Sequence, residues 1–327
     1  MNRVSVPSAF VRIAAVAAAL VFSLPAAAQQ LKGDVRFLNG FPPGGTSDLL
    51  GRLLAEAIGP VVGQKVIVEQ RTGASGFIAA EACAKSPPDG HTIFLSPMAV
   101  MAVAPVMPGQ KLTIDVDKDL TPISNLAGVY NILVVGGSTP FKTVGEVIDF
   151  AKKNPGKLTY ASAGNGTSQH LSGEFFKKLA AVDILHVPYR GGAPAILDIV
   201  GGRTTMMFGN MPEFLGQIRG GGLRAVAFGA ARPSPLFPDL PVINSTLPDF
   251  RISNWFGVVG PAGLSPEWTA FWNRSIQAVA KQPKFIQLMT DNGMEILAGS
   301  PEEFKATIVA DRRKWNEVIQ SAKIRAD

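Results

Sequence analysis

The feature that most constrains this fold is a repeated pattern of a short apolar segment, a glycine-rich turn and a helix start. Its first copy, VRFLNGFPPGGTSDLLGRLLAE, covers residues 35–56, and a second, LTYASAGNGTSQHLSGEFF, covers residues 158–176. Pro42 and Pro43 end the first strand-like segment, and the glycines after them let the backbone approach a bound group closely. Alternation of strand, turn and helix predicts an α/β fold whose parallel strand ends meet at one edge.

Each turn also predicts a place for an anion. The first N–H groups of a helix have no partner within it, and the helix dipole is positive at that end. Thr46, Ser47 or Asp48 can cap the first helix, while Gly164, Asn165, Gly166 and Thr167 precede the second. A carboxylate held between two such helix starts needs no catalytic side chain. For either turn alone, a plain strand-to-helix connection without a ligand is the alternative.

Residues 1–28 have the pattern of a cleavable secretory signal peptide. Arg3 and Arg12 precede an apolar run over residues 13–24, and small residues then predict cleavage after Ala28. An uncleaved anchor is the alternative. Later segments contain no run of about 18 uncharged apolar residues, which predicts a soluble mature protein.

The composition suits a globular chain with a small anionic ligand. Hydrophobic residues make up 46% and charged residues 17%, and the 299 residues left after cleavage (327 minus 28) suffice for two lobes. Without Arg3 and Arg12 the net charge falls from +6 to +4, scattered along the chain with no basic run, so no nucleic-acid partner is expected. The single Cys83 excludes an intrachain disulfide.

The order of the segments predicts two lobes joined by two hinge strands. We expect residues 29–127 and 252–300 to form the first lobe and residues 128–251 the second, with a helix over residues 301–327. A chain that leaves a lobe and returns to it makes at least two crossings, here near Gly128 and Arg251, and two lobes on two hinges close like a clamshell. The stripe Phe304, Ile308, Trp315 and Ile319 predicts core packing for the last helix.

Catalytic and cofactor motifs are weak. The three histidines, His91, His170 and His186, have no cysteine or carboxylate at metal-ligand spacing, so no metal is expected. Ser168 and His170 leave a hydrolase open as an alternative, although no GxSxG elbow is present. No dinucleotide fingerprint or phosphate-binding loop occurs, so no cofactor is expected.

With these residues in view, the chain resembles the Bug family, the extracytoplasmic solute receptors of tripartite tricarboxylate transporters. The resemblance covers nearly all of the mature chain. Its motifs are FPPGGTSD at 41–48, VIVEQRTGASG at 66–76, PDGHTIFL at 88–95, SAGNGTSQHLSGEFF at 162–176, HVPYRGGAPA at 186–195, PDLP at 238–241 and WFGVVGPAG at 255–263.

The resemblance implies a type II periplasmic-binding-protein fold, with two α/β lobes and a ligand cleft between them. It also implies a monomeric periplasmic receptor that hands a small carboxylate to the membrane components of a tripartite tricarboxylate transporter. A loaded receptor that signals to a sensor kinase is an alternative. The ligand stays open among dicarboxylates, tricarboxylates, aromatic acids, amino acids and nicotinate-like acids.

Backbone amides of the two cleft turns hold the carboxylate in that family, with further residues lining the walls. Carried over to this chain, the expected ligand-binding residues are Phe41, Gly44, Gly45, Thr46, Ser47, Ser96, Met98, Gly164, Asn165, Gly166, Thr167, Ser168, His170, Tyr189, Arg190, Gly191, Gly209 and Asn210. Arg190 is expected either to pair with a second carboxylate or to form a structural ion pair. Gly209 stands where many relatives have aspartate, which predicts extra room for a bulkier or more apolar ligand group.

Overall fold

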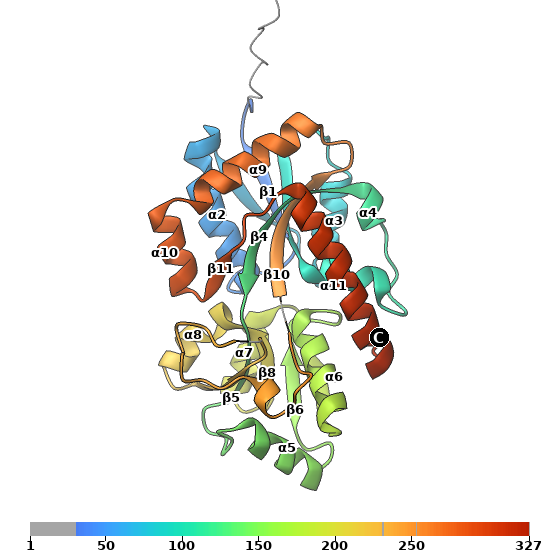
Figure 1. The fold of residues 1–327 in the computed structure, drawn as a ribbon, viewed down its shortest axis with the longest axis vertical. Coiled ribbons are helices and arrows are strands. Elements are labelled where there is room, and N and C mark those ends of the chain that lie inside the picture. The colour runs from blue at the N-terminus through green and yellow to red at the C-terminus, as the bar shows by residue number, and fades with distance from the viewer. Residues whose placement is uncertain (1–30, 231, 253, 327) are drawn as a thin grey trace, which may run out of the picture. The chain divides into compact units, whose positions relative to one another are not determined.

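The computed structural model describes residues 31–230, 232–252 and 254–326. The predicted signal peptide lies outside the described residues. The described chain contains a six-stranded and a five-stranded β-sheet, each with helices packed on it, as Figure 1 shows. None of the described helices combines the length and apolarity needed to cross a bilayer.

The first sheet has the strand order β11-β4-β10-β3-β1-β2. Its strands are β1 (Val35–Asn39), β2 (Val66–Gln70), β3 (Thr92–Pro97), β4 (Leu120–Val129), β10 (Asn254–Pro261) and β11 (Met294–Ile296). Strand β1 is parallel to β2 and β3, which places the ends of all three at one edge, as predicted. Strand β10 runs antiparallel to both β3 and β4.

Helices cover both faces of this sheet. One face packs against α2 (Thr46–Val62), α9 (Pro266–Ala280) and α10 (Pro283–Asp291), and the other packs against α3 (Phe77–Ala84) and α11 (Pro301–Ala322). Shorter helical segments connect them: η1 (Ala74–Gly76), the π-helix η2 (Ala99–Val103), η3 (Ala104–Val106) and α4 (Val116–Asp119).

The second sheet has the strand order β7-β6-β8-β5-β9. Its strands are β5 (Asn131–Gly136), β6 (Thr159–Ser162), β7 (Leu185–Pro188), β8 (Met206–Asn210) and β9 (Leu223–Phe228). Helices α5 (Val144–Lys153) and α6 (Ser168–Ala180) share the core of one face, while α7 (Gly192–Val200) and α8 (Met211–Arg219) share the other. The short η4 (Ile243–Ser245) follows β9.

The chain passes between the two sheets twice. Strand β4 belongs to the first sheet and is followed, after Tyr130, by β5 in the second. The chain returns after β9, and β10 enters the centre of the first sheet with every described side chain buried. A glycine within β10 makes this packing possible, because a Cβ on Gly257 would overlap the ring of Phe304 from α11.

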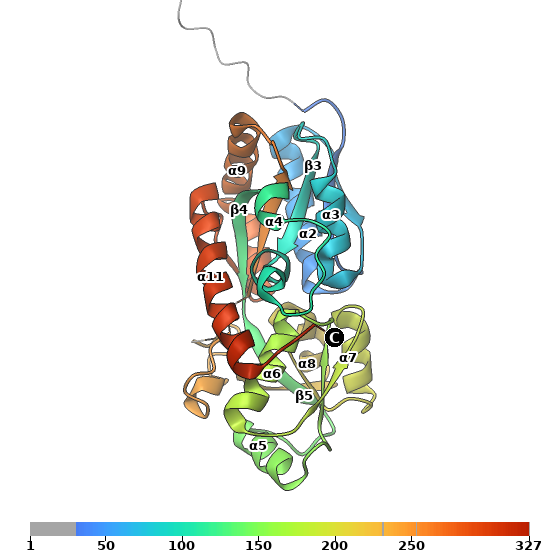
Figure 2. The same ribbon diagram turned by 90° about the vertical axis from the view of Figure 1, so that its right-hand side faces the viewer.

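Helix α11 begins at a capping box and buries one face. Ser300 accepts a hydrogen bond from the N–H of Glu303, and Pro301 follows the cap. Phe304, Trp315 and Ile319 are fully buried and Ile308 nearly so, which confirms the predicted core stripe. The helix runs along the first sheet and reaches α6 of the second, as Figure 2 shows.

Candidate functional site

The turn after β1 is fixed by two side chains that bind its backbone. The Asn39 Oδ1 atom accepts hydrogen bonds from the Phe41 N–H at 3.2 Å and from the Ser47 hydroxyl at 2.6 Å. Asp48 accepts from the Gly44 N–H at 3.2 Å, and its other oxygen accepts from the Gln70 amide at 2.8 Å. Gly45 caps α2 without a side-chain hydrogen bond of its own, so the first N–H groups of this helix are left to partners from outside the helix.

The turn after β6 is fixed in a similar way. Thr167 caps α6: its Oγ1 accepts from the His170 N–H at 3.4 Å and donates to the Gly164 carbonyl at 2.7 Å. The Gln169 Oε1 atom accepts from the Ala163 N–H at 2.7 Å. Gly164 and Gly166 have φ of 130° and 76°, a region that L side chains rarely adopt. The backbone conformation of this turn therefore requires glycine at both positions.

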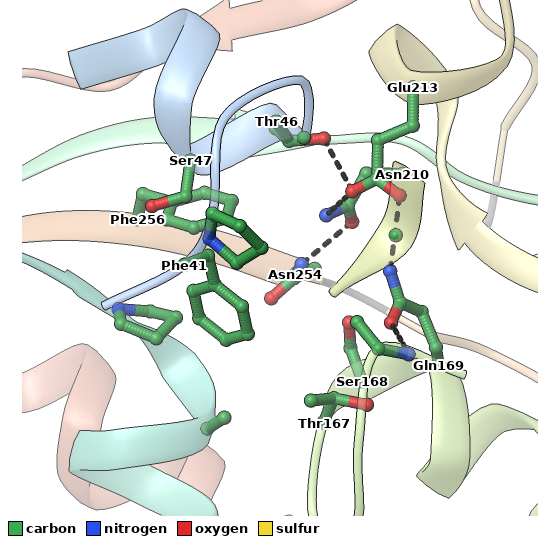
Figure 3. Close-up of a pocket in the computed structure, with 16 residues that line it drawn as sticks. Phe41, Thr46, Ser47, Thr167, Ser168, Gln169, Asn210, Glu213, Asn254 and Phe256 are labelled. Atoms are coloured by element: carbon green, nitrogen blue, oxygen red, sulfur yellow. Dashed lines mark hydrogen bonds between the residues drawn. The ribbon is translucent and has the colours of Figure 1, made fainter. Parts of the chain in front are cut away.

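The two turns face each other across a cavity that lies between the two sheets. Both sheets and the returning strand β10 contribute to its walls, as Figure 3 shows. The lining residues are Phe41, Pro42, Gly45, Thr46, Ser47, Pro97, Ala99, Ala163, Thr167, Ser168, Gln169, Gly192, Asn210, Glu213, Asn254 and Phe256.

A hydrogen-bonded chain of polar groups crosses the cavity wall (Figure 3). The Thr46 hydroxyl donates to Glu213 Oε1 at 2.8 Å, and the Asn210 amide donates to the same oxygen at 3.2 Å. The Asn254 amide donates to Asn210 Oδ1 at 2.8 Å. Burial raises the pKa of Glu213, although the bonds from Thr46 and Asn210 oppose that shift. These hydrogen bonds link α2 to β8, α8 and β10.

The lobes also touch beside the cavity. The Ser75 hydroxyl donates to the Asn165 carbonyl at 2.7 Å. Pro42 lies so close to Gly191 that a Cβ there would be 2.7 Å from the proline ring. These contacts join the two turns of the first lobe, after β1 and β2, to the turns of the second, after β6 and β7.

The structure gathers some of the expected site residues around the cavity and places others nearby. Those that line the cavity are Phe41, Gly45, Thr46, Ser47, Thr167, Ser168 and Asn210. Gly164, Tyr189, Arg190 and Gly191 line an adjoining groove together with Phe41. Asn165 and Gly166 line a smaller recess beside Met107. Gly44 lies in the turn itself, where its N–H is bound to Asp48.

Three expected residues point away from the cavity. The Met98 sulfur accepts a hydrogen bond from the Trp315 indole N–H at 3.1 Å and so faces α11. Ser96 is fully buried in β3, where it pairs with Gly257. A Cβ on Gly209 would lie 2.5 Å from the Phe214 ring. Phe214 therefore fills the space that the missing side chain at position 209 was expected to leave for a ligand.

His170 also lies outside the cavity lining and packs within the second lobe. Its Nδ1 atom accepts a hydrogen bond from the Gly166 N–H at 3.1 Å, and its ring stacks on His186 with centroids 4.4 Å apart. His186 stacks in turn on Tyr160, at 4.7 Å, and its Nε2 atom lies 2.7 Å from the Ser162 hydroxyl. The stacked rings pack inside the second lobe, and His170 holds the turn after β6 through its bond with Gly166.

The half-buried imidazole of His186 predicts a loss of stability in mild acid. Burial lowers the pKa of His186 from 6.5 to about 3, so the unfolded chain binds more protons between these two values. Stability is fully present above pH 6.5 and is lost as the pH falls through that window. We expect the free energy of unfolding to drop by about 1–2 kcal/mol between pH 7 and pH 5, with a discount for the partial exposure of the ring.

Urea unfolding at both pH values tests this, with His186→Gln as the comparison. The variant should lose most of the difference between the two pH values, because glutamine does not titrate. An equal drop in both proteins would assign the acid sensitivity to other groups.

Sequence reasoning missed four polar or aromatic residues of the cavity: Gln169, Glu213, Asn254 and Phe256. Gln169 lies directly after Ser168 in the first turn of α6, so the capping pattern contained a signal for it. Glu213 follows Pro212 in the first turn of α8, at the end of a strand, which is a similar signal. The two residues of β10 have no local signal, because only the sheet order brings them to the cavity.

Two α/β lobes joined by crossing strands, with a cavity between facing helix starts, are the architecture of a two-lobed solute-binding protein. The family model of the tripartite tricarboxylate transporter family receptor (TctC) matches residues 50–324. The chain belongs to this family.

Two solved structures and one further relative resemble this chain over most of its length. Rpa4515 of R. palustris, solved with adipate, is 30% identical, with a TM-score of 0.87 over 90% of this chain and 98% of that one. MatC of Rhodopseudomonas palustris, solved with bound malate, is 26% identical, with a TM-score of 0.83 over 88% and 98%. BugT of Bordetella pertussis is 31% identical over 292 residues, 88% of each chain. The expected Bug resemblance and the periplasmic-binding-protein fold are thereby confirmed.

Proposed function

We propose that this chain is a periplasmic receptor that captures a small carboxylic acid in the cavity between its lobes. In this proposal the acid is then delivered to the membrane components of a tripartite tricarboxylate transporter. The observation that carries the proposal is the cavity between the start of α2, whose cap residue Gly45 makes no side-chain hydrogen bond, and the start of α6. Helix starts favour a carboxylate through N–H groups that have no partner within the helix and through the positive end of the dipole.

The relatives support the same chemistry. Rpa4515 was solved with adipate and MatC with malate, and both ligands are carboxylic acids. The signal-peptide pattern of residues 1–28 supports export to the periplasm.

Capture requires the lobes to open and close, and the two crossings are the proposed hinges. In this proposal one lobe comprises residues 29–127 and 252–300 and the other residues 128–251. The segments that pass between them, around Tyr130 and before β10, would absorb the rotation. A ligand drives closure only to the extent that it binds the closed form more tightly.

Thermal unfolding of the mature protein tests the proposed function. The protein is first unfolded and refolded to remove any carried-over ligand, and then mixed with carboxylic acids and their matched amides. An acid at 100 times its dissociation constant should stabilise the fold by about 2.7 kcal/mol and raise the melting temperature measurably. Each matched amide should have a much smaller effect, because it lacks the charge that the helix starts favour. Equal effects of acid and amide, or none from any acid, would contradict the proposal.

A further inference from the structure

The cavity contains a carboxylate of the protein itself. Glu213 lies in the first turn of α8, and its side chain extends toward the groups around the cavity, as Figure 3 shows. Its Oε1 atom accepts hydrogen bonds from the Thr46 hydroxyl at 2.8 Å and the Asn210 amide at 3.2 Å. Its Oε2 atom accepts from the Gln169 amide at 3.3 Å. Three side chains from three different elements therefore donate to one carboxylate.

The surroundings of Glu213 are those of a bound anion. Thr46 is the first residue of α2, and Gln169 lies in the first turn of α6. A Cβ on Gly192, the first residue of α7, would overlap Oε2, so that helix also starts against the carboxylate. Among the ion pairs of the described residues, none involves Glu213. Donors and helix starts, rather than a cation, hold this group.

This position is the one that a second carboxylate of a ligand would need. Helix starts and amide donors are the groups that attract an anion, and here they already surround Glu213. A ligand carboxylate beside it would either place two like charges in a poorly solvated space or force one of the two groups to take up a proton, and both outcomes weaken binding. A hydroxyl or an ammonium there would instead donate a hydrogen bond to Glu213.

We propose that Glu213 takes the place of one ligand carboxylate, so that this chain prefers acids with a single carboxylate and a hydroxyl or ammonium at the other end. The inference rests on the proposed function, in which the ligand's own carboxylate binds near Ser47 and Ser168 at the starts of α2 and α6. Glu213 is then the residue that separates such acids from dicarboxylates.

Titration calorimetry at pH 7.5 tests this with a matched panel. The panel consists of straight-chain acids of four to seven carbons, each as the dicarboxylate, the ω-hydroxy acid and the ω-amino acid. The proteins are the refolded wild type, Glu213→Gln, and Glu302→Gln as a control that removes one exposed negative charge on α11. At the chain length that binds most tightly, the wild type should bind the hydroxy acid or the amino acid with a dissociation constant at least tenfold lower than that of the dicarboxylate.

Glu213→Gln should reduce this preference at least tenfold by binding the dicarboxylate more tightly, whereas Glu302→Gln should keep the wild-type ratio. Glutamine retains the size of the side chain, and melting temperatures of all three proteins verify folding. A wild-type preference for dicarboxylates, or an unchanged ratio in Glu213→Gln, would overturn the role of Glu213 and leave the proposed function standing. Absence of binding by every acid to both the wild type and Glu213→Gln would overturn both.

Discussion

Replacing Gly45 by valine should weaken binding of the carboxylic acid about 100-fold, equivalent to about 2.7 kcal/mol, while leaving the fold intact. Gly45 lines the cavity, and a Cβ placed on it meets no protein atom within 4 Å. The valine side chain would therefore occupy cavity space and keep the ligand away from the start of α2. The backbone at Gly45, with φ −96° and ψ 175°, is extended and suits a β-branched residue.

The experiment compares calorimetric affinities of Gly45→Val, Gly216→Val and the wild type for the best acid of the panel. Gly216 is an exposed residue of α8, and a Cβ placed on it also meets no protein atom within 4 Å, so valine there controls for added bulk. Gly166→Val would be harder to interpret, because the φ of 76° strains any L residue. Wild-type affinity in a folded Gly45→Val protein would exclude the start of α2 from the ligand site.

Much of the fold follows from local patterns. Strand β1 ends where Pro42 and Pro43 follow, and α6 begins where Thr167 caps it. These signals act over a few residues, so the sequence predicts them well. The π-helix η2 gave no such signal: its sequence AVMAV is apolar throughout, and every residue is buried. Such a run has no periodicity that separates helix from strand.

Strand geometry explains why two of the expected wall residues, Ser96 and Gly209, lie outside the cavity lining. Successive side chains of a strand point to opposite faces. Pro97, the last residue of β3, lines the cavity, and its strand neighbour Ser96 does not. Met98 lies beyond the strand at the start of η2, where its sulfur faces Trp315. Asn210 lines the cavity as well, and Gly209 accordingly faces Phe214. Motif matching selects whole runs of residues, whereas only alternate positions can reach a ligand from a strand.

Glu213 shows what sequence reasoning cannot reach. Its place at a helix start is a local property, but its partner Thr46 lies 167 positions away in the chain. The contact depends on how the two lobes face each other, which no local pattern encodes. The helix starts could thus be predicted as anion sites, while the presence of a protein carboxylate among them could not.

The largest effect on stability is expected from Trp315→Ala, which should lower the free energy of unfolding by about 3–5 kcal/mol. The Trp315 side chain is fully buried in α11, and its indole N–H donates to the Met98 sulfur. Alanine would leave a cavity beneath a helix that packs against both β4 and α6. Val309→Ala on the same helix is the control: Val309 is 60% exposed, and its loss should change stability by no more than about 0.5 kcal/mol. Urea unfolding of both variants measures the difference, and similar midpoints for the two would show that α11 contributes little to the stability of the fold.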